Sequence, residues 1–189
     1  MDRDLHFIAV LGSLRRQSFC RAIADTLDEI APNEVRVTVM DTAGELPHYN
    51  QDIEDFAVPD QVRDMSVAIG EADAVIIVTP EYNYSVPGVL KNALDWLSRP
   101  PRKPFAGKPV AIQTASPGTF GGVRAQHHLR QVLLSLDALV LNNPQVIIPR
   151  VGDRVDIDTR TLRDEETRSQ IAAQLIALVR LTRGKADRT

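Results

Sequence analysis

Apolar residues occur in short runs that alternate with longer stretches of helical spacing. Runs at 5–11, 35–40, 74–79 and 109–114 have the length and the apolar content of strands, and 139–149 holds the last strand material. The run AVIIVT at 74–79 is apolar on both faces, which is typical of the centre of a parallel sheet.

Helical spacing of apolar residues follows each strand, at i, i+3, i+4 and i+7. We expect helices near 19–30, 60–69, 87–97, 129–136 and 171–184. Each buries one apolar stripe and leaves a polar face in water.

Boundary residues sharpen these expectations. Ser18 is placed to cap the first helix, Pro32 and Asn33 end it, and Pro87 suits the first turn of the third. Gly184 is expected to end the last helix, and the charged tail beyond it to fray. The polar stretch from Gly44 to Pro59 reads as a loop.

The alternation of strands and helices predicts an α/β fold in which a parallel sheet has helices on both faces. Five strands favour the doubly wound, flavodoxin-like strand order 2-1-3-4-5 over the six-strand Rossmann order. The length of 189 residues fits one domain over 1–189.

Composition excludes several classes of protein. Lys plus Arg total 22 and Asp plus Glu total 25, so the formal charge of −3 lacks the basic excess of a nucleic-acid binder. One cysteine rules out a disulfide framework and fits a reducing compartment. No apolar run approaches the roughly 18 residues of a membrane span. The N-terminal run reads as a buried strand, not a signal peptide, so we expect a cytoplasmic protein without membrane contact.

Strands one, three and four are neighbours in the predicted order, so the loops after them meet at one edge of the sheet. The first loop, GSLRRQS, opens a helix whose N–H groups attract an anion. Ser13 and Ser18 add hydroxyls, and Arg15 and Arg16 add charge. This favours a phosphate site, although neither a P-loop nor GxGxxG is present. The alternative is a capped helix with two solvated arginines.

The other two loops suit a flat ring. The second, TPEYNYSVP, places Tyr82 and Tyr84 near the open end of the sheet, where they could flank a ring. The third, ASPGTFGG, has glycines that allow close backbone approach to a ligand. Taken alone, the second could be an ordinary turn and the third a flexible connector.

Three segments, GSLRRQSFCRAIA, TPEYNYSVPGVLKNALDWLSRP and ASPGTFGGVRAQHHLRQVL, together resemble the NADPH-dependent FMN reductase family. This flavodoxin-like group includes bacterial quinone, chromate and azo-dye reductases. The resemblance spans roughly residues 5–150, and its PEYNYSVPG…KNALDW block is the most specific part. It implies a non-covalent FMN, NADPH or NADH as electron donor, and a homodimer or a dimer of dimers (a homotetramer).

The resemblance also implies cofactor-binding residues. Those implied to hold the FMN phosphate are Ser13, Arg15, Ser18, Phe19 and Cys20. Those implied to line the isoalloxazine are Pro80, Glu81, Tyr82, Asn83, Tyr84, Ser85, Ser116, Pro117, Gly118, Gly121 and Gly122. The chain departs at Cys20, where relatives commonly have Asn, and a thiol is the weaker donor.

The implied function is an FMN-dependent NAD(P)H oxidoreductase that passes electrons to quinones, chromate, azo compounds or free flavin by a ping-pong cycle. No side chain is required as acid or base for hydride transfer, so no residue is assigned as catalytic, and Tyr82 is expected to stack on the ring. Arg16 is a possible contact for the NADPH 2′-phosphate. Two alternatives stay open: a flavodoxin-type electron carrier, and a flavin-free regulatory relative.

Other features lead elsewhere. His127 and His128 point about 100° apart on a helix and suit no common metal spacing, so no metal site is predicted. Cys20 is expected to be buried rather than a redox sensor. Trp96 is either core or subunit contact, and the segment 152–161 is either a flap near the site or a surface connector.

Overall fold

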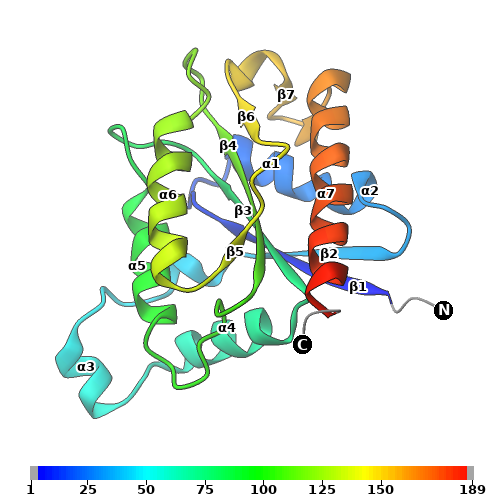
Figure 1. Ribbon diagram of the computed structural model, residues 1–189. Coiled ribbons are helices and arrows are strands. Elements are labelled where there is room, and N and C mark those ends of the chain that lie inside the picture. The colour runs from blue at the N-terminus through cyan, green and yellow to red at the C-terminus, as the bar shows by residue number, and fades with distance from the viewer. Residues whose placement is uncertain (1–3, 187–189) are drawn as a thin grey trace.

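A parallel sheet forms the centre of the protein in a computed structural model that describes residues 4–186 (Figure 1). The sheet follows the order β2-β1-β3-β4-β5, which confirms the prediction. Its strands are β1 (Leu5–Leu11), β2 (Val35–Met40), β3 (Ala74–Thr79), β4 (Pro109–Ala115), β5 (Leu139–Val140) and β6 (Val146–Ile148). The predicted fifth strand is two short pieces, β5 and β6, which pair with the beginning and the end of β4.

Helices cover both faces of the sheet, as Figure 1 shows. On one face lie α1 (Phe19–Asp25), α2 (Leu27–Ile30) and α7 (Glu165–Ala186). On the other lie α4 (Asp60–Glu71), α5 (Gly88–Leu97) and α6 (Val123–Ser135). Because side chains alternate along a strand, Phe7 and Ala9 pack toward the first set while Ile8 and Val10 pack toward the second.

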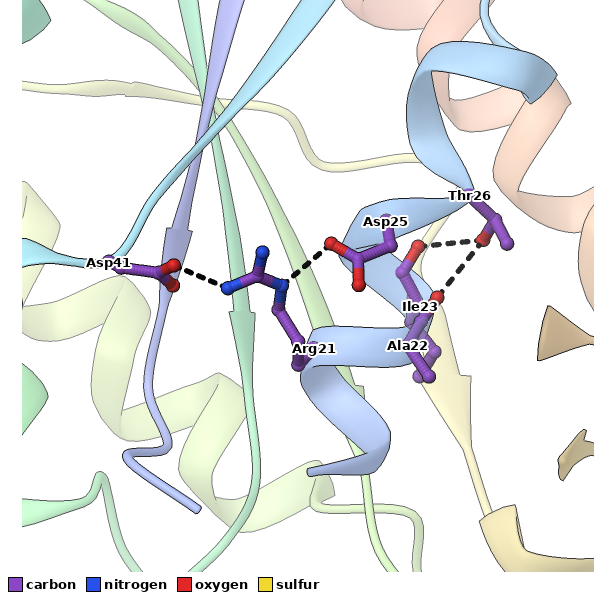
Figure 2. Close-up of polar contacts among 6 residues, drawn as sticks. All are labelled: Arg21, Ala22, Ile23, Asp25, Thr26 and Asp41. Atoms are coloured by element: carbon purple, nitrogen blue, oxygen red, sulfur yellow. Dashed lines mark hydrogen bonds and ion pairs between the residues drawn. The ribbon is translucent and has the colours of Figure 1, made fainter. Parts of the chain in front are cut away.

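The single helix predicted near 19–30 is two helices separated at Thr26. The Thr26 hydroxyl donates to the carbonyl of Ile23 at 2.7 Å, as Figure 2 shows. This local bond competes with the helical ladder at the point where α1 ends. Ser18 occupies the N-cap position, but its side chain makes no capping hydrogen bond.

The stretch 44–59 is not a plain loop, and that expectation was wrong. A turn of 3₁₀-helix, η1, spans Thr42–Gly44, and α3 spans Gln51–Phe56. No residue of α3 is buried, so its sequence carries no apolar stripe to reveal it. A side chain of α5 anchors this segment, because the Trp96 indole N–H donates to the carbonyl of Pro47 at 2.8 Å. Trp96 is fully buried and therefore belongs to the core.

Two further boundaries differ from expectation. Pro87 is the N-cap residue of α5 rather than part of its first turn. Gly184 lies inside α7, so it does not end that helix, and the tail expected to fray falls largely outside the described residues. The segment 152–161 begins in a 3₁₀ turn, η2 (Val151–Asp153), and continues as a small antiparallel hairpin of β7 (Val155–Asp156) and β8 (Thr161–Leu162).

Across residues 4–186, no helix combines the length and the apolar content needed to cross a membrane.

Candidate functional site

The three loops meet at a pocket of about 180 Å³ at the carboxyl edge of the sheet. Its lining residues are Ser13, Arg15, Ser18, Phe19, Cys20, Pro80, Glu81, Tyr82, Ala115, Ser116 and Pro117. All except Ala115 belong to the set that the sequence singled out. Parallel strands bring these residues together because the carboxyl ends of β1, β3 and β4 lie side by side.

A second pocket of about 310 Å³ adjoins the first, with which it shares Glu81 and Ser116. It is lined by Glu81, Asn83, Tyr84, Ser116, Gly118, Phe120, Gly122 and Arg124. Two of the residues predicted to bind FMN line neither pocket. The Ser85 hydroxyl lies 3.0 Å from Nδ1 of the exposed His128, and Gly121 packs against the end of β6, where an added Cβ would lie 2.6 Å from Ile147 Cγ2.

In the first loop, two hydroxyl groups are buried and two guanidinium groups are exposed to solvent. Ser13 and Ser18 are buried, whereas Arg15 and Arg16 are exposed. Ser13 Oγ accepts from the backbone N–H of Arg15 at 3.4 Å and lies 3.5 Å from the Tyr82 hydroxyl. These long contacts leave the Ser13 hydroxyl able to turn toward a ligand.

Cys20 lies beneath this loop with 2% of its surface exposed. Burial raises the pKa of the Cys20 thiol to about 12, and a hydrogen bond with the Ser18 side chain offsets only part of that rise. Since the thiolate is the reactive form, this thiol is an inert core group rather than a nucleophile or redox sensor.

The second loop is a tight two-residue turn. The backbone N–H groups of Tyr82 and Ser85 each donate to the carbonyl of the other at 3.0 Å. Between them Asn83 and Tyr84 both have positive φ, 48° and 67°. Such a turn ordinarily takes Asn-Gly, so the left-handed Tyr84 is a strained choice that projects its ring outward. Tyr84 is 66% exposed.

Glu81 joins the second loop to α6. Its carboxylate accepts from the backbone N–H groups of Arg124 at 3.0 Å and Ala125 at 3.1 Å, and from the Arg124 guanidinium at 3.2 Å. These N–H groups lie in the first turn of α6, where a negative charge is most favourable. The Glu81 side chain, 12% exposed, therefore fixes the second loop to the start of α6, directly after the third loop.

Arg124 is a residue of this site that the sequence reasoning missed. Its guanidinium lies 4.2 Å from the centre of the Tyr84 ring and 4.7 Å from that of Phe120. Stacking of this kind draws the exposed aromatic rings of the second and third loops onto one cation. An arginine in the first turn of a helix, following an aromatic and glycine-rich loop, was the available signal.

The third loop depends on the backbone freedom of glycine. Gly122 has φ of 87°, and a Cβ added there would lie 2.9 Å from the Thr114 Cβ. The loop therefore passes directly over the end of β4 where a larger residue would push it away. Thr114 Oγ1 is buried and has no hydrogen-bond partner within residues 4–186. Because glycine has no side chain, a planar ligand can approach the backbone of this loop closely.

No three His, Cys, Asp or Glu side chains among residues 4–186 are grouped as a metal site. His127 and His128 are both exposed on α6.

Comparison with known proteins gives this edge of the sheet its context. Residues 5–153 match the sequence profile of the NADPH-dependent FMN reductases. The chain belongs to this family. The match covers all three loops of the site and the sheet that carries them.

Relatives of the family extend the match to nearly the whole chain. A quinone reductase of Escherichia coli K12 is 46% identical over 178 residues, 94% of this chain and 95% of that protein. An NAD(P)H-dependent FMN reductase of Pseudomonas aeruginosa is 43% identical over 97% of this chain and 100% of its own length. The solved structure of FerB, a flavoenzyme NAD(P)H:(acceptor) oxidoreductase from Paracoccus denitrificans, superposes with a TM-score of 0.85 at 31% identity, covering 96% of this chain and 98% of its own.

Proposed function

We propose that this protein is an FMN-dependent oxidoreductase that takes electrons from NADPH or NADH and passes them to small acceptors. Quinones are the first acceptors to test, because relatives similar over most of the chain are quinone reductases. Chromate, azo compounds and free flavin are further candidates. The observation that carries the proposal is the convergence of the three loops on one pocket lined by residues of the family's cofactor motifs.

The first loop and the start of α1 are proposed to hold the FMN phosphate. Ser13 and Ser18 supply buried hydroxyls, and Arg15 supplies a guanidinium that can donate two parallel hydrogen bonds. Phe19 and Cys20 line the same pocket, and backbone N–H groups at the start of the helix add donors. The neutral Cys20 thiol leaves the negative phosphate without a competing charge.

The second and third loops are proposed to hold the ring. Pro80, Glu81, Tyr82 and Asn83 present mainly backbone groups, because the Glu81 carboxylate is already used on α6. Ser116, Pro117 and Gly118 line the pockets from the third loop, while Tyr84, Ser85, Gly121 and Gly122 set the shape of the two loops. Tyr82, 45% exposed, is proposed to stack on the ring.

FMN, when bound, would supply the redox chemistry, namely hydride acceptance from the nicotinamide and electron transfer to an acceptor. The chain contributes binding and orientation, and no lining side chain has to move a proton in hydride transfer. An open site of this kind lets the nicotinamide leave and the acceptor take its place. The lack of a required acid or base is consistent with the breadth of proposed acceptors.

A homodimer or a dimer of dimers is part of the proposal. Large apolar side chains are exposed on the described surface, among them Phe56 at 94% and Leu134 at 77%. Where such side chains join into a contiguous exposed patch, they mark a contact with another protein surface. Trp96, considered above as a contact, is buried within the protomer and does not contribute. We further propose a cytoplasmic location, where the single buried thiol stays reduced.

The first test is an anaerobic visible spectrum of the protein loaded with FMN, before and after NADPH, followed by a quinone. Retained flavin that NADPH bleaches and quinone restores supports the oxidoreductase. Retained flavin that neither NADPH nor NADH bleaches would identify an electron carrier instead. If no flavin is retained, the pocket is not an FMN site and the flavin-free alternative stands.

A matched pair of variants locates the phosphate site. Ser18→Ala is expected to weaken FMN binding about tenfold, because it removes a buried hydroxyl that donates to a charged group. Ser135→Ala serves as the control, since the Ser135 hydroxyl caps the far end of α6 at the carbonyl of Val132. Quenching of FMN fluorescence on titration with protein measures both affinities. Equal affinities for the two variants would count against the proposed phosphate site.

A further inference from the structure

A third pocket of about 270 Å³ lies beside the first loop and is strongly basic. Four arginines line it, Arg15, Arg16, Arg21 and Arg160, together with one carboxylate, Asp41. They come from the first loop, from α1, from the end of β2 and from the turn between β7 and β8. The sequence does not reveal this gathering, because Arg160 stands far along the chain from the others.

Among residues 4–186, only one of these arginines has an ion-pair partner. Arg21 donates to Asp25 at 2.6 Å and forms an ion pair with Asp41, as Figure 2 shows. The guanidinium groups of Arg15, Arg16 and Arg160 have no hydrogen bond or ion pair with any residue of 4–186. The single carboxylate of the pocket is thus already taken, and three positive charges remain for a ligand.

The hairpin holds Arg160 in place. The Asp156 carboxylate accepts from the backbone N–H groups of Asp158 at 2.9 Å and Thr159 at 3.1 Å, and it forms an ion pair with Arg163. The two strands pack against α1, which starts at the first loop. Arg160 itself has φ of 53°, a left-handed conformation in which an arginine is strained. A braced and strained residue facing a pocket is a common feature of ligand sites.

The basic pocket is distinct from the proposed FMN phosphate site, but the two share part of their lining. Ser18, Phe19 and Cys20 line only the flavin pocket, whereas Arg16 and Arg160 line only the basic pocket. Ser13 and Arg15 line both. A ligand in the basic pocket would therefore lie next to the proposed FMN phosphate site.

Guanidinium groups without partners are suited to a phosphomonoester, which carries two negative charges and accepts paired hydrogen bonds. We propose that the basic pocket binds the 2′-phosphate of NADPH, and that the guanidinium groups of Arg16 and Arg160 contact this phosphate. The inference rests on the proposed function, since NADPH is there the electron donor. The hairpin at 155–162 is accordingly a specificity element of the site rather than a surface connector.

The direct test is calorimetric binding of 2′,5′-ADP and 5′-AMP to the FMN-loaded protein, because these probes differ by the 2′-phosphate alone. We expect the wild type to prefer 2′,5′-ADP. Arg160→Asn is expected to weaken 2′,5′-ADP binding about tenfold and to leave 5′-AMP unchanged, since one charge-assisted contact is lost. Asn tolerates the left-handed backbone, so the hairpin is retained. Arg180→Gln is the control, because Arg180 is exposed on α7 and does not line this pocket.

Kinetics supply an independent readout. Arg160→Asn and Arg16→Ala are expected to lower kcat/KM for NADPH about tenfold and to leave that for NADH unchanged. Arg160→Lys keeps the charge and is expected to retain most of the preference, which separates a loss of charge from a loss of folding.

Five outcomes decide the proposal. Loss of 2′,5′-ADP binding alone in Arg160→Asn supports it. Equal wild-type affinity for the two probes overturns it, as does equal loss of NADPH and NADH use in the variants. Loss of FMN from Arg160→Asn also overturns it, because the pocket would then serve the FMN phosphate. A wild type that binds 2′,5′-ADP through Arg160 but oxidises neither nucleotide would reject the proposed function and leave the pocket standing.

Discussion

Two groups of arginines at the same edge of the sheet differ in what their charge does. Arg124 is bound to Glu81 and lies over two aromatic rings, so its charge holds the second loop on α6. Arg15, Arg16 and Arg160 surround a pocket with no carboxylate left to bind them. An arginine that pairs with a carboxylate of the chain stabilises the structure of the site. An arginine without such a partner is available to bind a ligand. Substitutions in the first group should cost stability, and those in the second should cost ligand affinity.

The largest loss of stability is expected where Glu81 joins the second loop to α6. Glu81→Ala should lower the free energy of unfolding by about 2–3 kcal/mol, because two backbone N–H groups and one guanidinium lose their acceptor. Urea denaturation measures the change. Glu71→Ala is the control, since Glu71 is exposed at the end of α4 and should change stability by less than about 0.5 kcal/mol. Equal stability of the two variants would mean that Glu81 does not anchor α6.

The next largest effect is expected where the third loop crosses β4. Gly122→Ala should destabilise the protein by about 1–2 kcal/mol, because its backbone is left-handed and the new Cβ meets Thr114. Gly184→Ala is a control with the opposite sign. It lies in α7 with open space around it and should stabilise the protein by roughly 0.5 kcal/mol, since alanine favours a helix. Thermal unfolding of both variants compares them, and a stable Gly122→Ala would show that the loop can shift.

A pair of arginine substitutions tests the comparison directly. Arg124→Ala should lower stability by about 1 kcal/mol, because one charge-assisted hydrogen bond and two ring contacts are lost. Arg16→Ala should change stability by less than about 0.5 kcal/mol, because its side chain is exposed and has no partner in 4–186. Both values come from urea denaturation without nucleotide. Equal losses at the two positions would remove the distinction between the groups.

The smallest effect at neutral pH is expected at Cys20, which carries no charge there. Its thiol pKa is about 12 in the folded protein against an ordinary value of 9.0, since burial disfavours the thiolate. Because the thiol has the higher pKa in the folded protein, its contribution to the free energy of unfolding is fully present below the unfolded pKa. That contribution is lost as pH rises through the folded pKa, so stability should fall between about pH 9 and 12. Cys20→Ala should lack this part of the pH dependence. Iodoacetamide should label Cys20 at pH 8 only after unfolding, and rapid labelling of the native protein would contradict the buried position.

Much of the fold could be predicted from local patterns. The run at 74–79 identified the central strand, and turn residues placed the loops between strands and helices. Errors fell where local signals are weak. A helix at 51–56 without a buried residue has no apolar period, and strands of two residues at 155–156 and 161–162 are too short to alternate. The break at Thr26 depends on a side chain that donates back to its own helix.

The sequence by itself determined the sheet order and the gathering of three loops, because parallel strands place their carboxyl ends at one edge whatever the side chains do. Only the tertiary structure decided how charge is distributed there. Glu81 reaches a helix 43 positions away, and Arg160 joins the first loop through a hairpin packed on α1. Electrostatic contacts depend on distance in space rather than on spacing along the chain, so no local pattern could show which arginines have partners.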